Sequence, residues 1–223
     1  MLKKFSLVLL SLFAQNAISG GMDPAGFDDE MGFYIGVDVG VSHLMDNQST
    51  TFPQISRSFS DNGAVGGGLA GYDYIINNRF KLGLEGFMNA TDLKFATNNH
   101  PNTISYNVRA NYNAGMRFLP GMKLAPNVIG HILVGYSNMK FTIKDSGVYG
   151  YIDQMINKSG FQCGLGFKIT LTRYLSLRTD TLYSTYGTLT SAGNSLSSAY
   201  SYQSYVNRFS TVEGEITLVY KFV

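Results

Sequence analysis

The chain has 223 residues, a length that suits one all-β domain or two small ones. Charged residues make up 14% of the chain and aromatic residues 13%, whereas soluble domains usually carry roughly 25% charged residues. With 25 Gly but only 5 Pro, the composition excludes a collagen-like or proline-rich disordered chain. The single Cys163 excludes an internal disulfide.

The first residues, 1–19, have the pattern of a secretory signal peptide. Lys3 and Lys4 form a basic start, and the apolar stretch 5–13 is too short to span a membrane as a helix. Small residues before Gly20 predict cleavage there, which lowers the net charge from +2 to zero because two lysines are lost. A neutral chain has no electrostatic footprint for nucleic acid. We expect a signal peptide at 1–19, a short N-terminal periplasmic segment at 20–31 and a β-barrel at 32–223.

Apolar and polar residues alternate along most of the remaining chain, which is the period of a β-strand. In the clearest segment one row is apolar or Tyr and includes Val108 and Ala110, while the other contains Arg109, Asn111 and Arg117. The sequence predicts eight such strands, at 33–42, 64–74, 80–88, 104–118, 128–137, 161–171, 175–183 and 212–222.

The connections between these segments alternate in length. Long ones rich in Ser, Thr, Asn, Asp and Gly are expected at 44–62, 91–103, 142–158 and 187–204, and short turns at 77–78, 119–125 and 172–173. This alternation is typical of an all-β, eight-stranded antiparallel up-and-down transmembrane β-barrel with both ends in the periplasm. Its strands need about 9–11 residues to cross the hydrocarbon.

Two features indicate that the polar row fills the bore and the apolar row faces lipid. The polar row is rich in Gly, such as Gly36 and Gly164, which suits the narrow interior of a small barrel. The apolar row carries rings near strand ends, such as Phe33 and Tyr220, as in an aromatic girdle. The opposite arrangement, a soluble lipocalin-like periplasmic lipid-binding barrel, stays open as an alternative.

Charged residues of the polar rows are expected to meet in the lumen, where buried charges must be paired. We predict a salt-bridge network that plugs the bore and limits any conductance to a small, gated one, with Glu85, Arg178, Asp180 and Glu215 among its members. The lumenal ion-pair candidates are Asp38, Lys81, Glu85, Arg109, Arg117, Lys168, Arg178, Asp180, Glu213, Glu215 and Lys221.

The sequence gives little support to catalysis. His131 and Ser137 are six residues apart, about 20 Å along a strand, which is too far for a nucleophile and its base. His43 and His100 fall at a strand end and in a connection. We expect no catalytic, cofactor-binding or metal-binding residues, no cofactor and no enzyme activity; a lipid-modifying enzyme of the outer membrane is the third alternative.

Aromatic residues in the long connections are candidates for surface contacts. Mixtures of Tyr and Ser suit adaptable recognition, although rings in a loop also pack against one another. The surface-loop contact candidates are Phe52, Phe59, Tyr149, Tyr151, Tyr200 and Tyr202.

At the level of such patterns the chain resembles the outer-membrane-protein β-barrel superfamily, which includes opacity-type porins and the transmembrane domain of outer membrane protein A. The matching stretches are Gly32-Phe33-Tyr34-Ile35-Gly36, Gly71-Tyr72-Asp73-Tyr74, Leu82-Gly83-Leu84-Glu85-Gly86, Leu175-Ser176-Leu177-Arg178 and Leu218-Val219-Tyr220-Lys221-Phe222. The resemblance implies that Glu85 and Arg178 are interior charges that take part in gating. The family's assembly signal ends in an aromatic residue, whereas Val223 follows Phe222 here.

These observations predict an integral outer-membrane surface protein in the cell envelope: structural, antigenic or adhesin-like, with a minor gated pore as an open alternative. The expected partners are outer-membrane lipids and lipopolysaccharide, the barrel assembly machinery and host surface molecules.

Overall fold

The computed structural model describes residues 31–50, 56–77, 79–97, 103–147, 150–191, 194–195 and 205–222. All regular elements in this part of the chain are strands: β1 (Gly32–Thr50), β2 (Ser56–Ile75), β3 (Phe80–Thr97), β4 (Thr103–Ala125), β5 (Val128–Gly147), β6 (Gly150–Thr170), β7 (Leu175–Ser191), β8 (Asn194–Ser195) and β9 (Tyr205–Lys221). Within those residues we find no helix with the length and apolar character of a membrane span.

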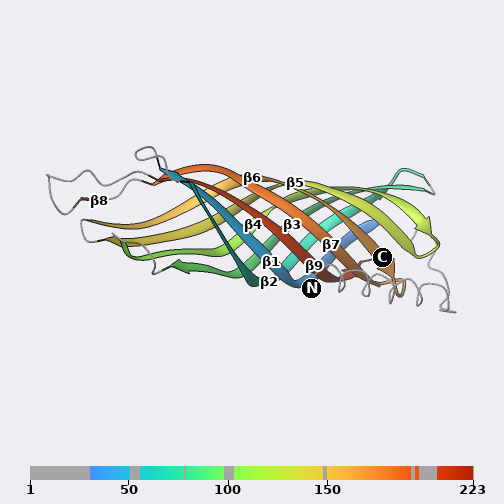
Figure 1. Cartoon of the computed structure of the whole chain (residues 1–223). Coiled ribbons are helices and arrows are strands. Elements are labelled where there is room, and N and C mark those ends of the chain that lie inside the picture. Colours follow the sequence, from blue (N-terminus) through green and yellow to red (C-terminus); the bar gives the residue numbers. More distant parts are fainter. Residues whose placement is uncertain are drawn as a thin grey trace, which may run out of the picture.

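Eight long antiparallel strands close into a barrel (Figure 1). Each pairs with its neighbour in the chain, and the ring closes because β9 pairs with both β1 and β7. The remaining element, β8, is a two-residue strand that pairs with the start of β6. The predicted fold, an eight-stranded up-and-down barrel, is therefore confirmed.

The register fixes how steeply the strands are tilted. A row of paired residues that starts at Lys81 on β3 passes once around the barrel and returns to β3 at Thr91, ten residues further along. For eight strands this stagger corresponds to a tilt of about 40° from the barrel axis. Such a tilt lies within the range of transmembrane barrels.

The strands are longer than predicted, with 17 to 23 residues. The connection predicted at 142–158 is almost entirely strand, because β5 runs to Gly147 and β6 starts at Gly150. The turn predicted at 119–125 is also wrong: those residues belong to β4, and the turn lies at 126–127. Polar segments that the sequence predicted as loops are therefore strands, and they pair with their neighbours in the barrel wall.

A belt of large apolar side chains covers the outside of the barrel next to the short turns. Val39 and Leu165 are 67% and 64% exposed. The alternate residues of each strand point inward instead and are buried or close-packed. This belt confirms the predicted orientation and contradicts the soluble lipocalin-like alternative. Its members include Phe33, Ile35, Val37, Val41, Phe80, Leu84, Met88, Met116, Phe118, Ile132, Val134, Tyr136, Phe161, Phe167, Tyr183, Val212, Ile216, Leu218 and Tyr220.

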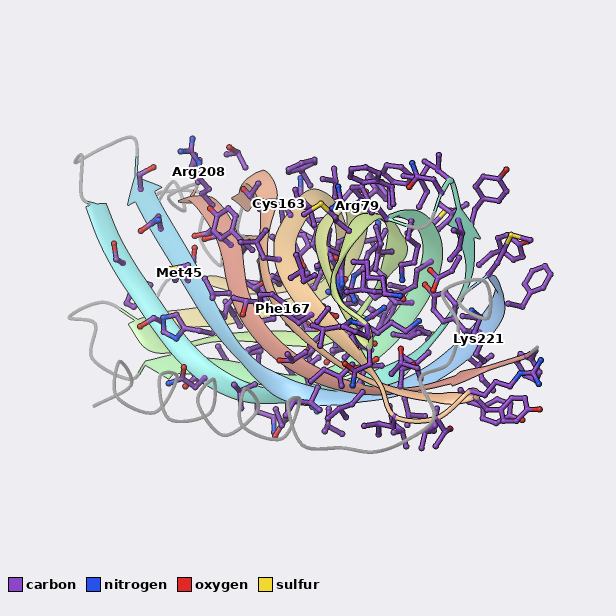
Figure 2. All side chains as sticks on the ribbon, turned by 90° about the vertical axis from the view of Figure 1, so that its right-hand side faces the viewer. Met45, Arg79, Cys163, Phe167, Arg208 and Lys221 are labelled. Atoms are coloured by element: carbon purple, nitrogen blue, oxygen red, sulfur yellow. The ribbon has the colours of Figure 1, made fainter. Side chains whose placement is uncertain are left out.

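The pattern inverts at the other end of the barrel, where the long connections lie. Here the interior holds a cluster of buried apolar residues beside buried polar ones such as Asp46 and Asn207. The cluster consists of Leu44, Leu93, Val108, Ala110, Met139, Phe141, Ile143, Tyr186 and Phe209. Figure 2 looks at the barrel from the end on the right of Figure 1 and shows side chains both within the ring of strands and projecting from it. Charged and polar residues occupy the outer face around this cluster, among them Lys94, Arg109 and Lys144.

A bulge in β4 corrects the sequence prediction for this strand. Ala110 pairs with Phe141 and Tyr112 with Lys140, so Asn111 is an extra residue relative to β5. An extra residue reverses the alternation beyond it. Val108 and Ala110 therefore face the interior instead of lipid, and Arg109 is exposed on the outside instead of lying in the lumen.

Candidate functional site in the barrel lumen

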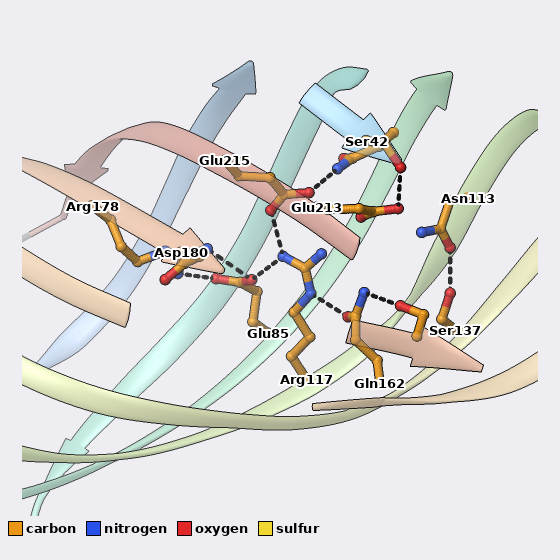
Figure 3. Close-up of polar contacts among 12 residues, drawn as sticks. Ser42, Glu85, Asn113, Arg117, Ser137, Gln162, Arg178, Asp180, Glu213 and Glu215 are labelled. Carbon is orange, nitrogen blue, oxygen red and sulfur yellow. Dashed lines mark hydrogen bonds and ion pairs between the residues drawn. The ribbon is translucent and has the colours of Figure 1, made fainter. Parts of the chain in front are cut away.

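Glu85 on β3 lies at the centre of the lumenal charges (Figure 3). Its carboxylate accepts hydrogen bonds from both terminal nitrogens of Arg178, at 2.6 and 3.1 Å. Tyr34 donates its hydroxyl hydrogen to the same carboxylate at 3.1 Å, and Arg117 lies 3.6 Å away. A Cβ at Gly71 would lie 2.5 Å from the Tyr34 ring. Any larger residue at this position would therefore clash with the ring in its observed place.

Arg117 on β4 joins this centre to the opposite wall. It donates to Gln162 Oε1 at 2.7 Å and to Glu215 Oε2 at 3.2 Å. Glu215 also accepts a hydrogen bond from Asn89 at 3.1 Å, and the Arg117 guanidinium lies 3.8 Å from the centre of the Phe87 ring. Fully buried ions are stable only when they are paired and hydrogen-bonded in this way.

A second group of charges lies toward the short turns. Asp73 forms ion pairs with Lys81 at 3.0 Å and with Lys168 at 3.3 Å. Asp180 forms an ion pair with Arg178 at 2.7 Å, and its carboxylate lies within hydrogen-bond distance of His131, at 2.8 Å. Because Arg178 contacts both Asp180 and Glu85, Asp180 and His131 are continuous with the first group.

The structure places ten of the eleven predicted lumenal residues inside the barrel, all except Arg109. Glu213 accepts a hydrogen bond from Ser42 at 3.2 Å, and neither carboxylate oxygen of Asp38 has a hydrogen-bond partner among the described residues. Sequence reasoning missed Asp73, which is buried, because its segment of glycines blurred the two rows.

A small cavity borders the second group of charges. A cavity of about 10 Å³ lies beside the two lysines of Asp73, which is room for about one water molecule. Its lining residues are Tyr34, Asp73, Lys81, Leu119, His131, Lys168, Arg178 and Val219.

The apolar cluster adds a second layer above the network. Phe141 stacks on Phe209 with ring centres 4.5 Å apart and meets Tyr186 edge-on at 5.7 Å. Ser137 connects the two layers, because its hydroxyl bonds to Asn113 and lies 3.2 Å from the Tyr186 hydroxyl. A polar layer and an apolar layer thus fill the bore in series.

The histidines do not form a nucleophile–base pair with a serine in the described structure. His131 contacts Asp180, whereas Ser137 bonds to Asn113. His43 lies on the outer face, with its Nδ1 2.7 Å from Asn62 Oδ1. No group of three or more His, Cys, Asp or Glu in the described ranges could hold a metal ion.

Most of the predicted surface contacts cannot be placed. Phe59 is half-buried on β2, and Tyr151 belongs to β6, but the structure does not describe its side chain. The candidates outside the described residues are Phe52, Tyr149, Tyr200 and Tyr202, together with His100, the predicted signal peptide at 1–19 and most of the segment at 20–31.

The closed antiparallel barrel with an apolar outer belt and a charged, filled bore defines a transmembrane β-barrel. The chain belongs to the outer membrane protein β-barrel domain family, whose sequence pattern matches residues 5–212. It is therefore a protein of the outer membrane, as predicted from the sequence.

The fold is similar to that of a solved outer-membrane protein. The chain is similar to the outer membrane protein OprG from Pseudomonas aeruginosa, with a TM-score of 0.58, 13% identity and coverage of 90% of this chain and 99% of that one. Neisserial surface protein A matches with a TM-score of 0.49 and 15% identity over 86% of this chain and 97% of that one. A comparison with curated protein sequences finds no significant match.

Proposed function

We propose that this barrel is a non-enzymatic surface protein that carries contact loops above the outer membrane and keeps its bore closed. The observation that carries the proposal is the double filling of the lumen, by the network around Glu85 and by the cluster around Phe141. A buried ionic layer followed by a cluster of buried apolar side chains supports a bore that is closed to solutes.

The length of the strands supports a role at the cell surface. The 23 residues of β4 rise about 57 Å along the axis at a rise of about 3.3 Å and a tilt of about 40°. The apolar band of a bacterial barrel is only about 25 Å tall. The rest of the wall extends beyond the lipid, so the connections between strands are held well clear of the membrane.

The contact role is adhesin-like or antigenic, with host surface molecules as partners. Its test is the adherence of cells that display the full chain to host cells, compared with cells that display a variant in which Tyr200 and Tyr202 are changed to Ser. We expect the variant to adhere less at equal surface amounts. Equal adherence, or none by the wild type, contradicts the contact role.

A minor gated pore is the second candidate, and one observation favours it. Glu85 is shared between Arg178 at 2.6 Å and Arg117 at 3.6 Å, so a rearrangement of these pairs could open the polar layer. Planar-bilayer recording tests this: we expect small, rare openings from the wild type and more frequent ones from Glu85→Ala. Large, permanently open wild-type pores would contradict the closed bore.

A further inference from the structure

The barrel wall has a gap between β6 and β7 at the end with the long connections. Pairing of these two strands stops where Phe161 pairs with Thr185, and β6 is paired on this side again only at its tip, by β8. Residues 155–160 of β6 and 188–191 of β7, all within the described part of the chain, form no pairs with each other. Each stretch still pairs on its other side, with β5 and with β9. Two strand edges therefore border this gap.

A bulge in β7 lies where the gap begins. Relative to β9, β7 has one extra residue between Thr185 and Thr188. Gly187 lies in this bulge and has a φ of +67°, in the left-handed region that glycine adopts at little cost. A bulge bends its strand and increases the local twist. Beyond Gly187, β7 therefore stays paired with β9 but departs from β6.

A side chain bridges the gap at one point. The Lys158 ammonium group donates a hydrogen bond to the backbone carbonyl of Thr188 at 3.2 Å. Unpaired strand edges are templates for pairing with another chain, and lysine is a residue with which proteins protect such edges. The short strand β8, at the far left of Figure 1, pairs with the tip of the same β6 edge. This edge therefore accepts an extended segment where one is present.

We propose that an extended segment of another polypeptide inserts into the gap as an additional strand and pairs with β6 and β7. In this mode of recognition main-chain hydrogen bonds supply affinity, and alternate side chains supply specificity. On the inner side the gap borders the apolar cluster, because Ile156 packs against the cluster and Tyr186 belongs to it. On the outer side Asn157 and Ser159 are exposed. The segment that fits is therefore an amphipathic strand of alternating apolar and polar residues.

Met155 gives the outer face of this edge an apolar contact point. It is 69% exposed and pairs with Thr142 on β5, and Asp153 and Asn157 flank it on the same face. Contact with an apolar side chain of the added strand would remove this surface from water. The inference names the kind of partner for the proposed contact role and rests on that role. Its test uses purified protein without host cells, so strand insertion and cell adherence can fail separately.

The test measures binding of a fluorescent peptide of alternating Thr and Val, with a Lys at each end, to folded full-length protein in detergent. A matched control peptide carries N-methyl groups on three alternate amides, which removes three hydrogen-bond donors and keeps the side chains. Each main-chain hydrogen bond contributes about fivefold in affinity, so the methylated peptide should bind about 100-fold more weakly. Lys158→Ala frees the Thr188 carbonyl and should strengthen binding about fivefold, whereas Lys94→Ala on β3 should not change it. An unchanged affinity of Lys158→Ala contradicts the insertion.

Disulfide trapping locates the bound peptide. In a Cys163→Ser background, a peptide with one cysteine should crosslink to Asn157→Cys and not to Asn107→Cys, an equally exposed position on a strand that is paired on both sides. Heat-modifiable gel mobility shows that each variant is folded. Equal binding of both peptides, equal crosslinking at both positions or no binding by the wild type would each overturn the proposal. Adherence that depends on Tyr200 and Tyr202, without peptide binding, would contradict strand insertion alone.

Discussion

The network makes a definite prediction for the loss of its central carboxylate. Glu85→Ala removes the partner of Arg178 at 2.6 and 3.1 Å and of Arg117 at 3.6 Å, and both guanidinium groups stay buried. Among the described residues, Asp180 then remains as the ion-pair partner of Arg178 and Glu215 as that of Arg117. Breaking a buried ion pair by removing one partner costs about 3–5 kcal/mol.

A double-mutant cycle separates this electrostatic effect from a simple packing defect. Removing both members of a buried pair costs much less than removing one, because no unpaired charge is left behind. We therefore expect Glu85→Leu/Arg178→Met to be more stable than Glu85→Ala, with a coupling of about 1–3 kcal/mol between the two positions.

Urea unfolding in lipid vesicles, followed by the heat-modifiable shift in gel mobility, measures these free energies. The matched control is Ser159→Ala, a substitution at an exposed polar position outside the network. The reasoning fails if Glu85→Ala unfolds within about 1 kcal/mol of the wild type, or if the double variant loses the full sum of the two single losses.

Three further predictions concern the second layer, the glycines and the membrane boundary. Phe141→Ala should lower the free energy of unfolding by about 3–5 kcal/mol in the same urea assay, since the ring is fully buried and stacked; a loss below about 1 kcal/mol contradicts a packed layer. Gly166→Ala should lower the free energy of unfolding by about 1–3 kcal/mol because the new Cβ would overlap Asp180 and His131. A variant as stable as the wild type would show that these two side chains can move aside. In a variant without the native cysteine, a cysteine at Thr142 should react with a membrane-impermeant maleimide on intact cells, whereas one at Leu165 should not; equal labelling contradicts the boundary.

The sequence was sufficient for the topology because the period of two is strong within the lipid belt. There each apolar row faces hydrocarbon over its full length, as in the run from Phe33 to Val41. The strand ends were not predictable in the same way. Beyond the lipid the outer face is polar, so segments such as 142–147 lose the apolar outward row that marked the strand, although their backbones stay paired.

The lumenal site was predictable only as far as the alternation holds. For charged residues on strands without a bulge, such as Glu85 and Arg178, the alternation of the two faces alone predicts that the side chain points into the lumen. Arg109 lies beyond a one-residue bulge, and nothing in the local sequence distinguishes such a bulge from a regular strand. Asp73 lies in the same strand as the run Gly66-Gly67-Gly68, and the missing side chains of these glycines remove the contrast between the two faces of that strand.

The two interiors of this barrel follow from one principle applied to two surroundings. Where the wall meets lipid, apolar residues such as Leu165 are stable outside and the polar network is confined to the bore. Where the wall extends beyond lipid, the outer face meets water, and the hydrophobic effect acts as in a soluble barrel to bury Phe141 and Phe209 inside. The change in interior polarity between Ser137 and Met139 on β5 therefore indicates the outer edge of the membrane.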